Sequence, residues 1–463
     1  MDIKVLVKAI SDFVWGPYML FLLVGTGVFL TIRLKFLPWR NLGHALKMIF
    51  EKTDKSDEKS GDISSFQSLM TALAATIGTG NIVGVATALV SGGPGAIVWM
   101  LVSAIFGLST KYAESVLAVK YREINKNGEY SGGPMYAMKN GIKIKWLGLL
   151  LAFLFALFAT VASFGIGNMT QANSIADAIN TSFGVSRQLV GFILVILSLV
   201  VLMGGIKSIG KVCGVIVPFM AIFYFLAAFV VIVINFKNVP SGVAEMFRMA
   251  FSPRAVAGGV GGAIVANMLQ AMRWGVARGV FSNEAGLGSA PIAAAAAQTN
   301  HPSKQGYINM TGTFIDTIIV CTMTGLVITS SGVLGTAGPD GKLIDGAQLT
   351  ILAFKTALGP FGGAIVTIGI ALFAYSTILG WEYYGEKSLE YLVKSRGICL
   401  AYRFLYCLIT YVGATMTLQF VWDVSDAMNG LMAIPNLLCL LILNNQVAKE
   451  CFDYQKNVRE KYF

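Results

Sequence analysis

The sequence predicts an all-α polytopic membrane protein with eleven transmembrane helices, in which one extra helix precedes two inverted sets of five. Three observations lead to this prediction: an apolar composition, a one-sided distribution of basic residues, and a glycine-rich interruption at the head of each set. Of the 463 residues, 55% are hydrophobic and 13% are charged, whereas soluble domains carry roughly a quarter charged residues. The composition therefore places the chain in a lipid bilayer.

Eleven apolar windows reach the length of about 20 residues that a membrane-spanning helix requires. They are 13–32, 66–90, 95–119, 147–177, 188–205, 212–235, 256–298, 308–333, 361–386, 400–417 and 427–445. The first window is long enough to stay in the membrane, so no cleaved signal peptide is expected. The window 256–298 is too long for one straight crossing, which predicts an interruption within it.

The basic residues predict the orientation of these windows. When the windows alternate with 33–65 inside, 24 of the 35 Lys and Arg lie inside, 8 lie outside and three lie within or at the edge of spans. This bias follows the positive-inside rule. It predicts a multi-pass plasma-membrane protein with its N-terminus outside and its C-terminus in the cytoplasm. Cytoplasmic loops then account for the net charge of +11, and nucleic acid is not an expected partner.

The windows and the charge count divide the chain into six segments. In order, we expect an extra N-terminal transmembrane helix (1–33), a solvated cytoplasmic linker (34–65), a first five-helix repeat (66–236), an extracellular connection (237–255), a second, inverted five-helix repeat (256–445) and a cytoplasmic tail (446–463). Five is odd, so the second set begins on the opposite membrane face from the first.

Cysteine and histidine do not indicate a metal centre or a catalytic constellation. The six cysteines show no CxxC or paired spacing, and four of them fall inside apolar windows, so they are interpreted as small core residues. Only His44 and His301 are present. We therefore expect neither an enzyme nor an organic cofactor.

The stretch "LAATIGTGNIVG" (73–84) interrupts the first window of the first repeat. Non-helical backbone at membrane depth is tolerated only against protein or a water-filled cavity. A break here would expose amides around Thr79 and Gly80, which attract an anion such as a carboxylate. It would also free carbonyls around Ala74 and Ile77, which suit an alkali cation. Close helix packing through small residues is the alternative reading.

The segment "RWGVARGVFSNEAGLG" (273–288) interrupts the matching window of the second repeat. Paired interruptions in two inverted halves are typical of the midplane site of a secondary transporter. We expect Gly275 and Gly279 to bracket an unwound turn, whose carbonyls near Gly275 could accept an ammonium group. Ser282 is the expected N-cap of the following half-helix, with Glu284 in its first turn.

The stretch "FAYSTILGWEYYG" (373–385) places adjacent hydroxyls, Ser376 and Thr377, in a long apolar helix. Such hydroxyls usually bond back to the preceding helical turn. The alternative is that both join the carbonyls of the first break to ligate a cation. Glu382 and Glu386 lie one turn apart on this helix and are interpreted as ionic groups at a helix end.

Other polar residues within the windows allow two readings. Asn168 and Gln171 lie one turn apart and are either interhelical contacts or a wall of the cavity, because an amide in lipid is costly unless paired. Interhelical pairing is the preferred reading for Asp316. Pairing is also preferred over substrate contact for the charged residues of the second interruption, which are Arg273, Arg278 and Glu284.

Three stretches resemble the alanine or glycine:cation symporter family: "GGPGAIVWMLVSAIFG" (92–107), "SNEAGLGSAP" (282–291) and "STILGWEYYGEKSLEY" (376–391). The resemblance extends over essentially the whole chain. It implies sodium-coupled uptake of L-alanine, glycine or close analogues by the inverted-repeat fold of the bacterial leucine transporter (LeuT). Sodium is then the coupling ion, the bilayer is the environment, and the monomer is the expected functional unit.

The LeuT-like "G-x-G-N" break matches residues 78–81. The resemblance implies that the amides of Thr79 and Gly80 bind the substrate carboxylate. It implies a sodium site formed by the carbonyls of Ala74, Ile77 and Phe373 and the hydroxyls of Ser376 and Thr377. Trp381 would line the pocket, and its bulk would suit a small amino acid. The ammonium contacts carry over only as a region around the second break, and a second sodium site near Asn81 stays open.

The sequence therefore favours a sodium-coupled symporter that imports small neutral amino acids by alternating access. A proton-coupled or exchange-type permease of the same fold is the alternative; it would need no hydroxyl pair at Ser376 and Thr377. An ion channel should show a repeated filter or a ring of like charges, and neither is visible. An intramembrane enzyme would need a nucleophile–base pair or a metal, and the scattered acids do not supply one.

Overall fold

The computed structural model describes residues 3–51, 60–253, 255–259, 262–339, 341–416 and 419–458, and most of these residues are helical. Within these ranges, eight helices are long and apolar enough to cross a membrane: Val5–Arg33, Gly95–Lys120, Lys145–Phe183, Gly205–Ile234, Pro302–Ser330, Pro360–Val393, Arg396–Thr415 and Trp422–Ile442. The predicted helical membrane-protein class is confirmed. The other three windows coincide with shorter helices, so the count of eleven crossings stays a prediction.

The N-terminal window forms two helices, α1 (Ile3–Val14) and α2 (Pro17–Arg33), and Pro17 begins the second because a proline cannot continue a helix. The linker predicted over 34–65 is not simply solvated. It forms α3 (Leu37–Arg40) and α4 (Leu42–Met48), and Leu34, Ala45 and Met48 are buried. Its buried residues recur every three to four positions, which is the pattern of a helix packed on one face. Residues 52–59 of the linker lie outside the described ranges.

The first set of five opens with an interrupted helix: α5 (Ser65–Thr76), a short 3-10 turn η1 (Thr79–Asn81) and α6 (Val83–Gly92). The helices that follow are α7 (Gly95–Lys120), α9 (Lys145–Phe164), α10 (Thr170–Phe183), α11 (Arg187–Leu202) and α12 (Gly205–Ile234). A π-helical turn, η2 (Gly165–Met169), joins α9 to α10. Between α7 and α9 lie a two-stranded hairpin, β1 (Glu123–Ile124) with β2 (Tyr130–Ser131), and α8 (Pro134–Gly141).

The second set departs most from the prediction. The connection from the first set forms η3 (Phe236–Asn238) and α13 (Val239–Phe251). The window 256–298 then begins with an antiparallel hairpin, β3 (Ala255–Gly259) with β4 (Gly262–Ala266). The helix α14 starts only at Met268 and ends at Asn283, and α15 (Pro291–Ala295) follows. The stretch 255–266 is apolar but rich in glycine, and glycine in the interior disfavours a helix.

The remaining helices of the second set follow in order. They are α16 (Pro302–Thr313), the π-helical turn η4 (Phe314–Cys321), α17 (Thr322–Ser330), α18 (Gly346–Leu358), α19 (Pro360–Val393), α20 (Arg396–Thr415) and α21 (Gln419–Ile442). The predicted tail carries α22 (Asn444–Asp453) and a π-helical turn, η5 (Tyr454–Val458). Its residues Cys451 and Tyr454 are buried, so the described part of the tail packs on the bundle.

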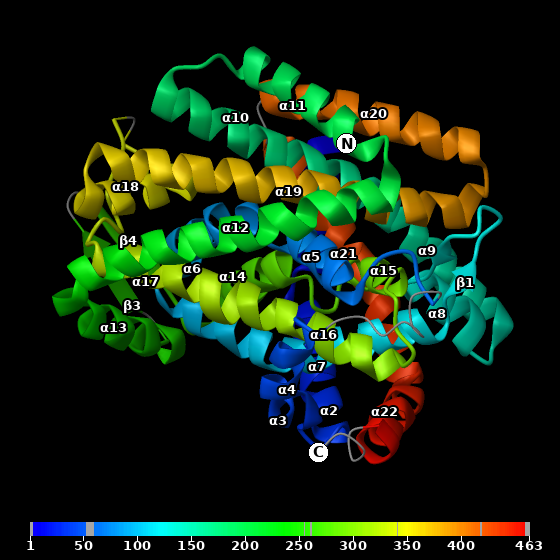
Figure 1. Ribbon diagram of the computed structural model, residues 1–463. Helices are drawn as coiled ribbons and strands as arrows, with labels where there is room; N and C mark the ends of the chain where they lie inside the picture. The colour runs from blue at the N-terminus through cyan, green and yellow to red at the C-terminus, as the bar shows by residue number, and fades with distance from the viewer. Residues whose placement is uncertain are drawn as a thin grey trace.

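The long helices run side by side along the bundle (Figure 1). The helices α7, α14 and α16 pack together below the middle of the view, above α2, α3, α4 and α22, and α10, α11 and α20 lie near the upper edge, while α19 runs between the two groups. One end of the bundle carries α13, α18 and the β3–β4 hairpin, and the other carries β1 and α8. The first end carries α13 and α18, from segments that the charge count assigned to the outside, and the other carries β1 and α8, from a segment that it assigned to the inside.

Two glycines of α14 allow this helix to pack closely against α7. A side chain at Gly275 would collide with the Ala96 carbonyl oxygen and would place Cβ 2.8 Å from Trp99 Cβ. A side chain at Gly279 would place Cβ 2.8 Å from Ser103 Oγ. The two glycines lie four residues apart, which is the spacing of small residues at close helix contacts in membranes.

We expect Gly275→Ala to destabilise the protein by about 1–3 kcal/mol, because overpacking a tight contact forces backbone shifts. Thermal unfolding of the detergent-solubilised protein measures the effect. Gly25→Ala is the matched control, since Gly25 lies inside α2 with nothing within 4 Å of an added Cβ. Equal melting temperatures for Gly275→Ala and the control would contradict close packing at Gly275.

Candidate functional site

The first predicted break is present. Helix α5 ends at Thr76, Ile77 is extended with φ −77° and ψ 94°, and α6 begins at Val83. The Asn81 side chain stabilises the turn, because its Oδ1 accepts a hydrogen bond from the Gly78 amide at 2.9 Å. A side chain at Gly78 would collide with Thr377 Oγ1, so only glycine permits this approach to α19.

All five oxygens predicted to bind sodium converge where α5 meets α19. Thr377 Oγ1 lies 3.0 Å from the Ala74 carbonyl oxygen, 3.4 Å from that of Ile77 and 3.0 Å from that of Phe373. Ser376 Oγ lies 3.3 Å from the Ala74 carbonyl oxygen and 2.8 Å from that of Phe373. All five residues are buried. We call this group the five-oxygen cluster.

The geometry of the cluster is compatible with both readings of the hydroxyl pair. Each hydroxyl bonds back to Phe373 in the preceding turn, as such groups commonly do, and each also reaches a carbonyl of the first break. None of its oxygens belongs to a carboxylate, and the described residues contain no group of three or more His, Cys, Asp or Glu that could hold a metal ion. The cluster is therefore suited to a hard monovalent cation rather than to a transition metal.

The amide side of the break meets Gln171 on α10. The Thr79 amide donates to Gln171 Oε1 at 3.2 Å, and Gln171 Nε2 donates to the Ile166 carbonyl at 2.8 Å. An uncharged amide oxygen thus occupies a position where a carboxylate could bind. Gly80 is packed against the end of α14, since a Cβ there would lie 3.1 Å from Ser282 Cα. The structure therefore brings Thr79, Gly80 and Gln171 together.

Asn168 belongs to the π-helical turn η2, and Trp381 packs against this turn from α19. Asn168 Nδ2 donates to the Tyr406 carbonyl at 2.7 Å, which makes it an interhelical contact with α20. The fully buried indole of Trp381 packs on Gly167, where a side chain would collide with it. Its ring lies 5.6 Å from that of Tyr384, edge to face. Trp381 thus fills space beside η2 on the same helix as the hydroxyl pair.

The second break lies about ten residues beyond its predicted position, at 284–290. Gly275 and Gly279 are helical, so the expectation of an unwound turn with free carbonyls near Gly275 is wrong; those glycines are used for packing. Ser282 is not an N-cap but lies in the last turn of α14, and Glu284 ends that helix with φ 58°. Glycine occurs both where two helices pack closely and where the chain turns with a positive φ, and composition alone does not distinguish the two cases.

A buried polar network connects the two breaks through Asp316 on η4. Asn81 Nδ2 donates to Asp316 Oδ1 at 2.6 Å, and Ser282 Oγ donates to Asp316 Oδ2 at 2.9 Å. Thr317 Oγ1 donates to the same carboxylate at 2.7 Å. The predicted interhelical pairing of Asp316 is confirmed, and its partners come from both interrupted helices.

The charged residues near the second break are paired with other residues. Arg278 forms an ion pair with Asp426 at 3.1 Å, and Arg273 forms one with Asp12 at 2.8 Å. Glu284 accepts from Ser289 Oγ at 2.9 Å. On α19, Glu386 pairs with Arg403, and Glu382 lies 3.8 Å from the same guanidinium. These two glutamates lie inside α19, not at its end.

Sequence reasoning missed three charged residues that contact the backbone of the interrupted helices: Lys111, Glu114 and Arg122. Lys111 and Glu114 lie three residues apart within an apolar helix, and such a pair at membrane depth is a signal of function or mutual pairing. Arg122 follows α7 directly and resembles any basic loop residue in the sequence. Its contacts depend on the tertiary fold.

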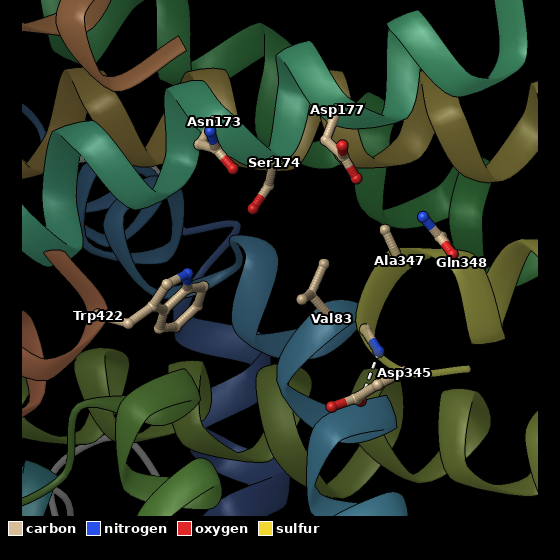
Figure 2. A pocket seen from close by; sticks show the side chains of 9 residues that line it. Val83, Asn173, Ser174, Asp177, Asp345, Ala347, Gln348 and Trp422 are labelled. Atoms are coloured by element: carbon tan, nitrogen blue, oxygen red, sulfur yellow. Dashed lines mark hydrogen bonds between the residues drawn. The ribbon is translucent and has the colours of Figure 1, made fainter. Parts of the chain in front are cut away.

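A cavity of about 260 Å³ opens beside the first break. Figure 2 shows Val83 at its floor, with Asn173, Ser174 and Asp177 of α10 above it and Trp422 to one side. The other lining residues belong to the start of α18 and are Asp345, Gly346, Ala347 and Gln348. Burial raises the pKa of the Asp345 carboxyl, and a hydrogen bond from the Gly346 amide opposes that rise. The cavity is thus polar and adjoins the site.

Comparison with known proteins gives concordant matches. The sequence model of the sodium:alanine symporter family matches residues 1–462. The chain is 54% identical over 450 residues to the sodium/alanine symporter AgcS of Methanococcus maripaludis, covering 97% of each chain. It is 36% identical over 457 residues to the amino-acid carrier protein AlsT of Bacillus subtilis, covering 98% of this chain and 93% of AlsT.

Among solved structures, the fold is similar to that of MhsT in complex with L-phenylalanine. The TM-score is 0.58 at 13% sequence identity, and the match covers 87% of this chain and 94% of MhsT. At this identity the likeness concerns the fold alone. It confirms the LeuT-like architecture that the motifs imply.

Proposed function

The chain belongs to the sodium:alanine symporter family, and we propose that it imports alanine, glycine or a close analogue together with sodium across the plasma membrane. The protein is a membrane transporter and not an enzyme. The observation that carries the proposal is the five-oxygen cluster, which lies one turn from the backbone amides of the same break. An ion site and a carboxylate site thereby share one interruption of a helix.

We place the coupling sodium ion in the five-oxygen cluster. Hydroxyl and carbonyl oxygens are hard ligands, and the C-terminal end of α5 contributes the negative end of its dipole. When the ion binds, the hydroxyl hydrogens of Ser376 and Thr377 turn away so that both oxygens face it. Because α5 and α19 belong to different repeats, a bound ion holds the two repeats together.

We place the substrate carboxylate at the amides of Thr79 and Gly80, where Gln171 Oε1 now accepts from Thr79. The carboxylate would displace Gln171 Oε1 and accept the hydrogen bond of the Thr79 amide in its place. The ammonium group is assigned to the C-terminal end of α14, whose last carbonyls lack helical partners. The bulk of Trp381 leaves room for a small side chain only. Gly275 and Asn168 are assigned packing roles instead.

Two features of this conformation support alternating access. The cavity of Figure 2 leads toward the first break from the end that carries α18, and the charge distribution assigns this end to the outside. The opposite end is closed, because the segments before α5 and after α15 are hydrogen-bonded, with the Asp62 amide donating to the Ala296 carbonyl at 2.8 Å. We propose an outward-oriented state of a monomer whose C-terminus lies in the cytoplasm.

Uptake of labelled alanine into proteoliposomes tests the proposal. We expect accumulation under an inward sodium gradient and loss of accumulation when potassium replaces sodium. Unchanged uptake with only a proton gradient would instead support a proton-coupled carrier. That outcome is worth measuring because one relative is named a putative sodium/proton-dependent alanine carrier, YrbD of Bacillus subtilis. Competition by glycine, and its absence with phenylalanine, tests the size limit.

A further inference from the structure

The second break is held by two charged side chains of α7. Lys111 and Glu114 lie one helical turn apart, and 1% and 3% of their surfaces are exposed. Lys111 Nζ donates to the Asn283 carbonyl at 2.7 Å. Glu114 Oε1 accepts from the amides of Gly286 at 3.0 Å and Gly288 at 3.2 Å. Lys111 thus binds the backbone just before the second break, and Glu114 binds the backbone within it.

The charge of each side chain is opposite to the partial charge of the backbone group that it contacts. Asn283 is the last residue of α14, so its carbonyl belongs to the negative end of the helix dipole, which favours an ammonium group. Gly286 and Gly288 have φ of 95° and 81°. Backbone amides in a turn can form a concave anion-binding nest, and here the amides on either side of Leu287 donate to the Glu114 carboxylate.

A third residue completes the arrangement from α21. Asn436 Nδ2 donates to Glu114 Oε1 at 2.7 Å and to the Gly286 carbonyl at 3.0 Å. The carboxylate oxygen facing the break therefore accepts three hydrogen bonds, while Glu114 Oε2 has no partner among the described residues. A buried charged group is costly unless it is hydrogen-bonded, and Lys111 and Glu114 keep these hydrogen bonds only while the break keeps its present shape.

The end of α14 that Lys111 and Glu114 fix is also the surface that meets the first break. A Cβ at Gly80 would lie 3.1 Å from Ser282 Cα and 3.3 Å from Phe281 Cδ1. Ser282 Oγ donates to Asp316, whose carboxylate also binds Asn81. A shift of the α14 end would therefore change the distance between the amides of the first break and the carbonyls of the second.

From this geometry, and on the premise of the proposed function, we propose that Lys111 and Glu114 are positioning residues that set the affinity for the amino acid. They hold the C-terminal carbonyls of α14 at the distance from Thr79 and Gly80 that a zwitterion spans, and they do not touch the substrate. The five-oxygen cluster lies on α5 and α19, outside their contacts, so sodium binding should depend on them far less than alanine binding.

The test compares graded substitutions in proteoliposomes. We expect Glu114→Ala to raise the KM for alanine about tenfold or more, since buried amides lose their acceptor. Glu114→Gln keeps an acceptor oxygen and should raise the KM less. Lys111→Met should behave like Glu114→Ala, and Lys111→Arg should restore most of the affinity. The sodium concentration for half-maximal uptake, measured at saturating alanine, should change less than twofold.

Lys120→Met is the matched control, because Lys120 lies at the end of the same helix and pairs with Glu450. Its KM for alanine should equal that of the wild type. Calorimetry of alanine binding to the purified protein separates a change in affinity from a change in expression or folding. If Glu114→Ala fails to fold, the test uses Glu114→Gln against the wild type and Lys111→Met against Lys111→Arg. A wild type without sodium-driven alanine uptake would refute the proposed function. A wild type that transports, with unchanged KM in these variants or equal shifts in the sodium and alanine constants, would refute the positioning role alone.

Discussion

Replacing Ser376 and Thr377 together by alanine is expected to lower sodium-driven alanine uptake by about 100-fold at low sodium. The double change removes two of the five oxygens of the five-oxygen cluster, and each is in hydrogen-bonding contact with a carbonyl of the break. Losing two hard ligands of a buried cation corresponds to roughly 1–3 kcal/mol for each. Uptake measured against sodium concentration should show a raised half-saturation, with a smaller loss at saturating sodium.

Ser388→Ala provides the control for this experiment. Ser388 is also buried on α19, but within the described part of the chain its hydroxyl donates only to the Tyr384 carbonyl of its own helix, at 2.8 Å. The control should keep the sodium dependence of the wild type. If the double variant kept it as well, these hydroxyls would not be sodium ligands. The single variants add detail: Thr377→Ala should be the more damaging, since Thr377 alone reaches Ile77.

The five-oxygen cluster could be predicted from sequence because its signals are local. Glycines, threonines and an asparagine stand out in an apolar window, and a break at Gly78 frees carbonyls within one helical turn. The adjacent hydroxyls of Ser376 and Thr377 are equally visible in α19. The pairing of the two segments was one of two readings of the hydroxyls, and the family resemblance favoured it and added the Phe373 carbonyl.

The second break could not be placed in this way. Gly275 permits close helix packing and Gly286 permits a positive φ, but the sequence shows only a glycine in both cases. The difference lies in what surrounds them, which is α7 in the first case and the Glu114 carboxylate in the second. The β3–β4 hairpin was missed for a related reason, since an apolar window does not by itself specify a helix.

Arg122→Ala is expected to open the end of the transporter that we assign to the cytoplasm. Arg122 Nη1 donates to the carbonyls of Ala295 at 2.9 Å and Ala297 at 2.8 Å, and Nη2 donates to that of Ser60 at 2.6 Å. Ser60 precedes α5, whereas Ala295 and Ala297 end and follow α15. One guanidinium therefore joins the chain segments that lead into the two interrupted helices.

The backbone reinforces this closure. The Gln298 amide donates to the Ile63 carbonyl at 2.8 Å, and Ile63 pairs with Ala297 as in a parallel sheet. Gly61 packs so closely on Ala297 that a side chain would collide with its carbonyl. These contacts are neutral and extend over few residues. The charge-assisted bonds of Arg122 are the strong members of the set, since such bonds are roughly twice as strong as neutral ones.

Removing Arg122 should therefore shift the population toward the inward-open state by about tenfold or more, because a single charge-assisted bond contributes roughly 1.5–3 kcal/mol and a tenfold shift corresponds to about 1.4 kcal/mol. A cysteine introduced at Ala293, which is buried on α15, reports the opening through its rate of thiol labelling above the parent protein. Labelling should accelerate in Arg122→Ala, and saturating sodium should slow it again, because the proposed ion in the five-oxygen cluster would favour the present state. Lys120→Ala, two residues earlier, should label like the wild type. Equal labelling rates in all three would mean that the backbone pairing alone closes this end.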